Sequence, residues 1–158
     1  MPLQIINSFA TWILKKRIHQ MELFLKYPHE VQDELLLSLI KSAENTQIGR
    51  KYDFSSMKNY TTFSDRIPVS TYEELEPLIE LTRKGEQNVF WHSNIKWFAK
   101  SSGTTNAKSK FIPVSSEALE NCHYKASKDL LCLYLNNNED SQMFTGKSLR
   151  LGGSKQLY

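Results

Sequence analysis

Hydrophobic residues recur at helical spacing through the first part of the chain. Residues 3–26 carry one apolar stripe, and a second stripe follows Pro28 and ends near residues 45–49, which predicts two amphipathic helices. We interpret the first stripe as a core or docking face, because a helix lying on a membrane would carry a more basic polar face. Residues 50–68 are polar with scattered aromatic side chains, which indicates an ordered connector. The stripe residues are Ile5, Phe9, Trp12, Ile13 and Phe24 in the first helix and Val31, Leu35, Leu39 and Ile40 in the second.

A third helix is predicted after the connector. Ser70 with Glu73 and Thr71 with Glu74 both match a capping box, in adjacent registers. Pro77 lies inside this helix and should kink or restart it, because proline removes one backbone hydrogen bond. We interpret the glutamates of this helix as a solvated face, since metal-binding carboxylates would converge from separate elements. They are Glu73, Glu74, Glu76 and Glu80.

The hydrophobic period changes after residue 90. Residues 95–99 and 111–114 are short, apolar and bulky, which predicts two β-strands. Pro113 restricts the second strand to an edge or a strand end, because proline cannot donate a hydrogen bond to a neighbouring strand. The segment between the strands, which contains residues 101–110, is predicted to be a turn.

A long helix is predicted after the second strand, capped by Ser115 or Ser116 and ended by the asparagines at 136–138. Residues 149–151 resemble one more strand. These elements predict an α/β fold, with a helical N-terminal half followed by the start of a mixed sheet. In isolation such a sheet lacks partner strands, so we expect exposed apolar surface and poor solubility.

The length and the net charge of the chain indicate its number of domains and the partners that it is not expected to bind. With 158 residues the chain is long enough to form one domain with a real core. Its net charge is only +3 and its basic residues are mixed with acidic ones, whereas nucleic-acid binding needs a clustered basic face. No stretch approaches the roughly 20 apolar residues of a membrane span. We therefore expect neither nucleic acid nor membrane as a partner.

The cysteines and the N-terminus favour a cytoplasmic protein. Cys122 and Cys132 lie ten residues apart on one predicted helix, a separation of roughly 15 Å, so they cannot form the disulfide that needs Cα atoms within roughly 7 Å. Two unpaired thiols are typical of a reducing compartment. The basic residues 15–17 follow the first apolar stretch, whereas in a signal peptide they precede it.

The histidines do not suggest a metal site. They show no spacing typical of metal ligands, and we assign neither a metal ligand nor a catalytic residue in this chain. The four are His19, His29, His92 and His123.

The segment Ser101–Lys110, SSGTTNAKSK, carries the strongest candidate chemistry. Glycine lets backbone N–H groups approach phosphate oxygens, hydroxyls donate short hydrogen bonds, and lysine adds a movable positive charge. The same residue types also dominate ordinary turns. From residue types alone, a phosphate-binding loop and a polar turn both stay open.

Other nucleotide-binding motifs fit poorly. Gly146-Lys147-Ser148 matches the end of a Walker loop, but Ser141 stands where its first glycine is required. The glycine pattern of dinucleotide-binding folds is absent from the sequence. A kinase that uses Gly146–Ser148 remains a minor hypothesis.

The segment Phe98–Ser115, FAKSSGTTNAKSKFIPVS, resembles the first signature motif of adenylate-forming enzymes. More narrowly, the chain resembles the Gretchen Hagen auxin-responsive promoter family of acyl acid amido synthetases, in a bacterial version. Further segments resemble the family in the same order, so the similarity covers essentially the whole chain. They are Asn45–Tyr52, Ile67–Leu78, Gly85–Val89 and Lys147–Lys155.

The resemblance implies an enzyme that uses ATP and Mg²⁺ to convert a carboxylic acid into an acyl-adenylate, with release of pyrophosphate. An amine, usually that of an amino acid, then forms the amide. The loop would hold the ATP phosphates, with Lys110 as the lysine of the motif. Ala107 stands where the family often has a second glycine. The other phosphate-binding positions that the resemblance implies are Ser101, Ser102, Gly103, Thr104 and Thr105.

The same resemblance implies that residues 1–158 are an incomplete N-terminal portion of the large adenylate-forming domain. The family motifs for adenine, ribose, metal, acid and amine lie further along the chain in relatives, so we expect this portion to be inactive alone. The alternative is a small helical binding or interaction protein in which the Ser/Thr-rich segment is only a turn.

Overall fold

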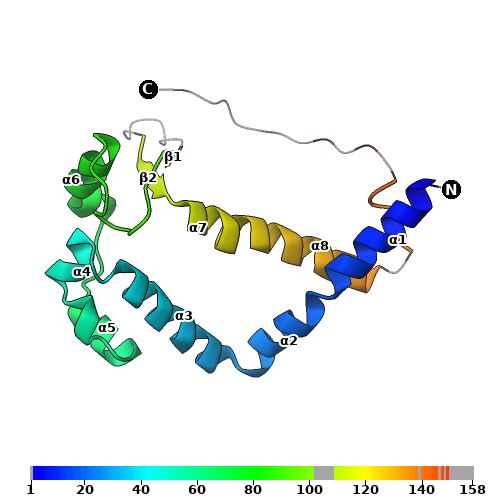
Figure 1. The fold of residues 1–158 in the computed structure, drawn as a ribbon, viewed down its shortest axis with the longest axis horizontal. Helices are drawn as coiled ribbons and strands as arrows, with labels where there is room; N and C mark the ends of the chain where they lie inside the picture. The colour runs from blue at the N-terminus through cyan, green and yellow to red at the C-terminus, as the bar shows by residue number, and fades with distance from the viewer. Residues whose placement is uncertain (1, 102–108, 139, 146, 148, 150–158) are drawn as a thin grey trace. The chain divides into compact units, whose positions relative to one another are not determined.

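The computed structural model describes residues 2–101, 109–138, 140–145, 147 and 149. Figure 1 shows the helices and strands coloured in order along the chain. The chain divides into two compact units. The first unit comprises Met1–Glu22 and Ala126–Tyr158, and the second comprises Leu23–Lys125. Among the described residues, no helix combines the length and apolar character that crossing a membrane requires.

The N-terminal apolar stripe forms two helices. Helix α1 spans Pro2–Lys15 and α2 spans Ile18–Lys26, so the prediction of a single helix over residues 3–26 is wrong. The chain turns at Arg17, whose backbone N–H bonds to the Leu14 carbonyl at 3.0 Å. Neither glycine nor proline marks the break. The break was therefore invisible in the local sequence.

A long-range ion pair holds this turn within the first unit. The Arg17 Nε donates to Asp129 Oδ1 at 2.7 Å, and Nη2 donates to Asp129 Oδ2 at 3.2 Å. This carboxylate lies on α8 (Lys125–Asn137). The fully buried Cys132, also on α8, donates its thiol to the Leu14 carbonyl at 2.9 Å. The turn between α1 and α2 is thus fixed by contacts more than a hundred residues away in sequence.

The second unit begins with helices joined by an ordered connector. Helix α3 follows Pro28, as predicted, and the connector folds into short helical pieces rather than remaining irregular. The elements of this part are α3 (Pro28–Ala43), α4 (Gln47–Lys51), the 3₁₀ turn η1 (Phe54–Ser56), α5 (Tyr60–Arg66) and α6 (Tyr72–Arg83).

Helix α6 begins with a complete capping box. The Glu74 backbone N–H donates to Thr71 Oγ1 at 3.3 Å, and the Thr71 backbone N–H donates to Glu74 Oε2 at 2.7 Å. The second of the two predicted registers is therefore the one used. The helix runs through Pro77 without restarting.

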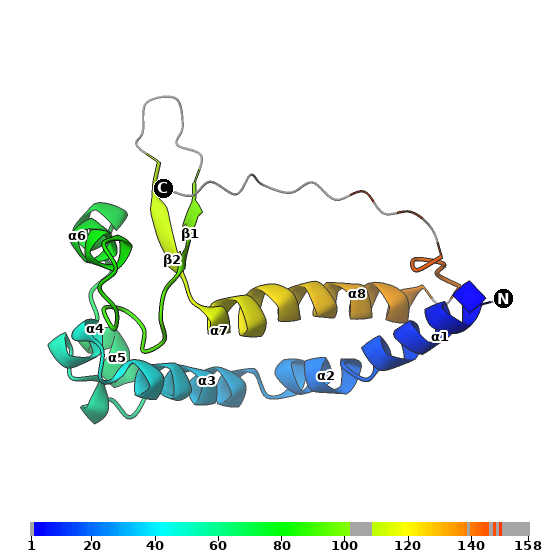
Figure 2. The ribbon, with the colours of Figure 1, turned by 45° about the horizontal axis from the view of Figure 1, so that its top comes forward.

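The two predicted strands are confirmed and pair with each other. Strand β1 spans Trp97–Lys100 and β2 spans Phe111–Val114, in an antiparallel hairpin (Figure 2). In the register, Lys100 lies opposite Phe111 and Phe98 lies opposite Pro113. Leu149 lies in no strand, and residues 150 and 151 of the further predicted strand lie outside the described residues. The described sheet is thus one antiparallel pair within a mostly helical chain.

A long helical run follows β2. Ser115, rather than Ser116, is its cap, since Ser115 Oγ accepts the Ala118 backbone N–H at 3.0 Å. The run ends among the predicted asparagines, at Asn137. Its three successive parts are α7 (Ser116–Ala118), the π-helical segment η2 (Leu119–Tyr124) and α8.

The core of the second unit lies where α4 meets the segment after α6. Thr46 and Val89 are almost completely buried there. The Gln47 backbone N–H donates to the Asn88 carbonyl at 3.0 Å, and that of Ile48 donates to the Val89 carbonyl at 3.1 Å. Two segments singled out in the sequence, 45–52 and 85–89, therefore pack against each other.

Candidate functional site

The Ser/Thr-rich segment is the connection of the β1–β2 hairpin, and its two ends are held together. The Ser101 backbone N–H donates to the Lys110 carbonyl at 2.9 Å. In return, the Lys110 backbone N–H donates to Ser101 Oγ at 3.2 Å. The structure thus brings together the first and the last of the six phosphate-binding positions implied by the sequence. The other four, Ser102, Gly103, Thr104 and Thr105, lie outside the described residues.

The pairing at the base of the hairpin sets which groups face the neighbouring helix. Ser101 and Lys110 lie opposite each other, so their side chains share one face of the hairpin. Hydrogen-bonded and non-hydrogen-bonded pairs alternate along an antiparallel ladder. The next pair, Lys100 with Phe111, is therefore non-hydrogen-bonded, and the backbone N–H and carbonyl of Phe111 point away from β1. By the same alternation, the nitrogen of Pro113, which has no hydrogen to donate, faces away from β1, as expected for an edge position.

Tyr72, the first residue of α6, occupies the outward edge at Phe111. Its phenolic oxygen accepts the Phe111 backbone N–H at 2.9 Å and donates to the Phe111 carbonyl at 3.5 Å. At the other end of α6, the Arg83 guanidinium lies 3.9 Å from the centroid of the Phe111 ring. Both ends of α6 thus attach to one residue of β2, which fixes the helix beside the base of the loop.

Lys110 turns its side chain toward the start of α6. Its Nζ lies 2.9 Å from Glu73 Oε1 and 4.8 Å from the centroid of the Tyr72 ring. The hydrogen bond from Lys110 lowers the pKa of the Glu73 carboxyl, helped by the residue's own backbone N–H and by the positive charge of the lysine. The motif lysine therefore rests between a carboxylate and an aromatic face.

The glutamates of α6, interpreted from the sequence as a solvated face, also make specific contacts in the structure. Glu73 is exposed but pairs with Lys110, Glu74 completes the capping box and Glu80 pairs with Arg83. A helical projection shows only that these residues face outward from α6. Such a projection gives no information about the hairpin that lies next to α6, so sequence reasoning missed Lys110 as the partner of Glu73.

A close approach of backbones supports the helices that carry the site. Thr46 caps α4: its Oγ1 accepts the Gly49 backbone N–H at 3.0 Å and donates to the Ala43 carbonyl at 2.7 Å. A Cβ added at Gly49 would lie 2.0 Å from the Ala43 carbonyl oxygen, far inside van der Waals contact. Glycine is thus required where α4 crosses the end of α3.

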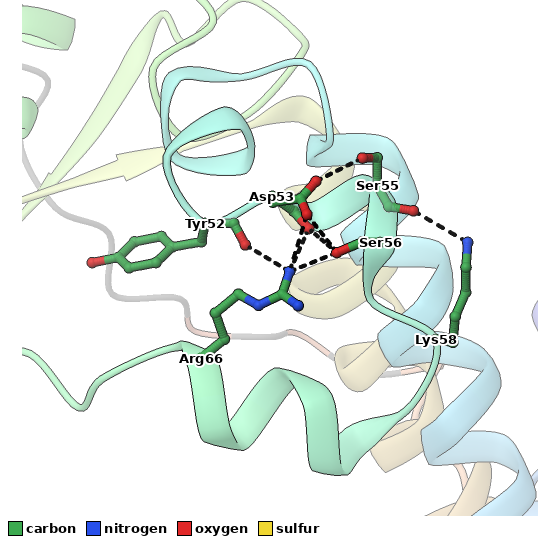
Figure 3. A network of polar contacts seen from close by, with 6 residues as sticks. All are labelled: Tyr52, Asp53, Ser55, Ser56, Lys58 and Arg66. Atoms are coloured by element: carbon green, nitrogen blue, oxygen red, sulfur yellow. Dashed lines mark hydrogen bonds and ion pairs between the residues drawn. The ribbon is translucent and has the colours of Figure 1, made fainter.

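The most connected polar network of the connector closes the turn between α4 and α5 (Figure 3). The Arg66 Nη1 donates to the carbonyls of Tyr52 and Asp53, at 3.2 and 2.8 Å, and to Ser56 Oγ at 2.7 Å. The Asp53 backbone is left-handed, with φ 51°. Hydrogen bonds from the hydroxyls of Ser56 and Ser55 lower the pKa of the Asp53 carboxyl. These groups satisfy one another, which indicates a structural role for the network.

Metal-binding groups do not gather in the described part of the chain. Within those residues, no three His, Cys, Asp or Glu side chains are placed to hold one ion. The described groups suited to a nucleotide are the Lys110 ammonium and the Ser101 hydroxyl, which can accept one hydrogen bond and donate another. Residues 146 and 148 of the Walker-like tail lie outside the described residues.

Comparison with known proteins identifies the family of the chain. Residues 17–157 match the GH3 family N-terminal domain. The chain is 29% identical over 106 residues to the indole-3-acetic acid-amido synthetase GH3.2 of Arabidopsis thaliana, covering 66% of this chain and 19% of that protein. It is 27% identical over 144 residues to the jasmonoyl-L-amino acid synthetase JAR4 of Nicotiana attenuata, covering 89% of this chain and 24% of that protein.

The fold has a solved counterpart. The structure of the GH3.15 acyl acid amido synthetase superimposes with a TM-score of 0.68 at 23% identity, over 78% of this chain and 22% of that one. The chain thus spans about a fifth to a quarter of the length of these relatives. The family match, which extends over most of the chain, identifies it as a member of the GH3 family, the Gretchen Hagen auxin-responsive promoter family that its motifs resemble.

Proposed function

We propose that this chain supplies the ATP phosphate-binding loop of an acyl acid amido synthetase. The observation that carries the proposal is the convergence of Ser101 and Lys110 on one face at the base of the hairpin, in a chain that belongs to the GH3 family. A hydroxyl and an ammonium carried by two paired residues suit the oxygens of a polyphosphate. Residues 102–105 complete the loop in this proposal.

The reaction we propose has two steps. A carboxylate oxygen of the acid attacks the α-phosphorus of ATP, so that an acyl-adenylate forms and pyrophosphate leaves. The nitrogen of an amine or amino acid then attacks the acyl carbon, AMP leaves and the nitrogen loses a proton. The relatives support this substrate class, since one is an indole-3-acetic acid-amido synthetase and another is a jasmonoyl-L-amino acid synthetase.

The contribution of this chain to that reaction is electrostatic. Negative charge grows on the departing pyrophosphate, and fixed donors stabilise it most when they are in place beforehand. The Lys110 ammonium and the Ser101 hydroxyl would meet the phosphates, and the two hydrogen bonds between these residues hold their backbones together at the base of the loop. Mg²⁺ would arrive with the nucleotide and neutralise phosphate charge; we assign it no ligand in this chain.

We also propose that residues 1–158 form an incomplete N-terminal portion of the adenylate-forming domain and do not catalyse the reaction alone. The chain covers only 19% of the indole-3-acetic acid-amido synthetase GH3.2 and 24% of the jasmonoyl-L-amino acid synthetase JAR4. The acid, the amine and the adenine would be bound mainly by other polypeptide. The natural open reading frame that contains this sequence should exchange labelled pyrophosphate into ATP when a suitable carboxylic acid is present, and the isolated chain should not.

Titration of MgATP into the isolated chain tests the phosphate-binding loop directly, by calorimetry or by ³¹P NMR. Lys110→Met should weaken binding about tenfold, because a hydrogen bond to a charged group contributes roughly 1.5–3 kcal/mol and about 1.4 kcal/mol is tenfold. Lys108→Met is the matched control and should change the affinity much less. An unchanged affinity in Lys110→Met, or an equal loss in both variants, would contradict the assignment. No binding at all would favour the alternative of an interaction protein.

A further inference from the structure

The contacts of Lys110 suggest where its side chain lies before a phosphate binds to the loop. The ammonium lies 2.9 Å from a Glu73 carboxylate oxygen and 4.8 Å from the centroid of the Tyr72 ring. Both partners come from the first turn of α6. Neither residue belongs to the Ser/Thr-rich segment, and the phosphate assignment gives neither of them a role.

Tyr72 is held firmly while the ion pair is open to exchange. The Tyr72 phenol contacts both backbone groups of Phe111, so its ring keeps one position relative to the base of the loop. The side chains of Lys110 and Glu73 are 41% and 67% exposed. An ion pair this exposed is weak, so the lysine can leave it without any backbone change.

The charged groups near the Lys110 ammonium determine whether it pairs with Glu73 or with a bound phosphate. Arg83 and Lys100 lie over the Phe111 ring, and Arg83 is itself paired with Glu80. In the described structure, Glu73 is thus the carboxylate that meets Lys110 directly. A polyphosphate carries several negative charges, so it competes strongly for the same ammonium. Glu73 therefore opposes phosphate binding by competing for Lys110.

We propose that Tyr72 and Glu73 form a resting site for Lys110, which the lysine leaves when a polyphosphate binds, so that Glu73 sets the affinity of the loop. This inference rests on the proposed function, because it requires Lys110 to contact phosphate. Glu73 is here a positioning residue: it orients the lysine in the empty loop and does not contact the nucleotide. Tyr72 keeps the lysine beside the loop through its ring while the ammonium changes partner.

A double-mutant cycle tests the inference with inorganic pyrophosphate and with MgATP at low ionic strength. The proteins are the 158-residue chain, Glu73→Gln, Lys110→Met and the double variant. Glu73→Gln should bind both ligands about three- to fivefold more tightly, in line with the small energies of exposed ion pairs. In the Lys110→Met background, the same substitution should give little or no gain, because position 110 then holds no lysine for which Glu73 and the phosphate compete.

The matched control is Glu76→Gln, which removes the same charge from the same helix. It should improve binding by much less than Glu73→Gln. An equal gain from both substitutions, or a gain that persists without Lys110, overturns the inference in favour of general charge repulsion. Unchanged or weaker binding by a folded Glu73→Gln protein, as judged by circular dichroism, also overturns it.

Failure of the proposed phosphate-binding function gives a different result from failure of the resting site. If the unsubstituted chain binds neither pyrophosphate nor MgATP, the proposed function fails and this inference falls with it. If the chain binds both and only Glu73→Gln has no effect, the phosphate-binding function stands and the resting site is wrong. A second readout is the ¹³C resonance of the Glu73 carboxyl, which should move toward that of a free carboxylate as pyrophosphate saturates the protein.

Discussion

Lys110 and Glu73 show how a single contact joins two parts of the second unit. One residue stands at the end of the Ser/Thr-rich segment and the other in the first turn of α6, and their charged atoms lie 2.9 Å apart. The hydrogen bond from Lys110 is the main reason that the pKa of Glu73 is lowered. A lowered carboxyl pKa favours the charged form in the folded state. The pair is therefore formed at neutral pH and is lost as the pH falls through the lowered pKa of Glu73.

The pKa of Glu73 is a direct measure of this contact. We expect ¹³C NMR titration of the carboxyl to give a pKa below the ordinary value for glutamate, about 4.3. Lys110→Met should raise that pKa toward the ordinary value, because the main hydrogen bond and the nearest positive charge are both removed. Lys108→Met serves as the comparison and should leave it nearly unchanged. Equal titration in the parent chain and in Lys110→Met would mean that the ion pair does not form in solution.

At the scale of elements, the positions of α6 and α4 depend on a few close contacts. Tyr72 and Arg83 attach the two ends of α6 to Phe111 of β2. On the other side of the unit, α4 crosses the end of α3 so closely that Gly49 has no room for a side chain. The short helices of the connector therefore pack closely within the unit that carries the hairpin.

Gly49→Ala should destabilise the second unit strongly. The new Cβ would lie 2.0 Å from the Ala43 carbonyl oxygen and 2.7 Å from that of Glu44, so backbone must move. We expect the free energy of unfolding to fall by about 3 kcal/mol, the upper part of the usual range for overpacking. Urea denaturation followed by circular dichroism measures this change.

The matched substitution for this experiment is Asp65→Ala, at an exposed position of the neighbouring helix α5. It should alter the free energy of unfolding by no more than about 0.5 kcal/mol. A Gly49→Ala protein as stable as Asp65→Ala would show that α4 does not approach α3 as closely as described.

At the scale of the whole molecule, the chain consists of two compact units. Each unit carries one free cysteine: Cys132 is fully buried in the first, and Cys122 is exposed in the second. Burial raises the pKa of the Cys132 thiol, helped by the nearby charge of Asp129. A raised thiol pKa means less thiolate at a given pH, and the thiolate is the reactive form.

The two thiols should therefore react with Ellman's reagent at very different rates. In the folded chain at pH 8, Cys122 should react quickly, whereas Cys132 should react only as its unit opens. Cys122→Ser should remove the fast phase and leave the slow one. Fast reaction of both thiols in the folded protein would contradict the described packing of α8 against the Leu14 carbonyl. In urea, both thiols should react at similar rates.

The described residues also expose many large apolar side chains, including Ile5 at 71% and Leu25 at 85%. The two strands contribute to this surface through Trp97 and Ile112, exposed at 52% and 53%. The expectation of exposed apolar surface is thus confirmed for the described part of the chain. Poor solubility remains a prediction, which the concentration limit of the purified chain would check.

The sequence by itself determined the features that depend on neighbouring residues. The Thr71–Glu74 cap, the start of α3 at Pro28, the two strands of the hairpin and the end of α8 all follow from patterns a few residues long. Such features are readable because the interacting groups lie within one or two turns of each other. The family motifs were equally readable, since they are local strings in a fixed order.

Only the tertiary structure decided which distant groups meet. The break at Arg17 depends on Asp129, and the place of Lys110 depends on Glu73 and Tyr72. The packing of segment 45–52 against 85–89 likewise joins residues some forty positions apart. No local pattern encodes these pairs, because each depends on how several elements close around a common core. The sequence thus suggested a phosphate-binding role for the loop, and only the tertiary structure shows that Lys110 contacts Glu73 and Tyr72.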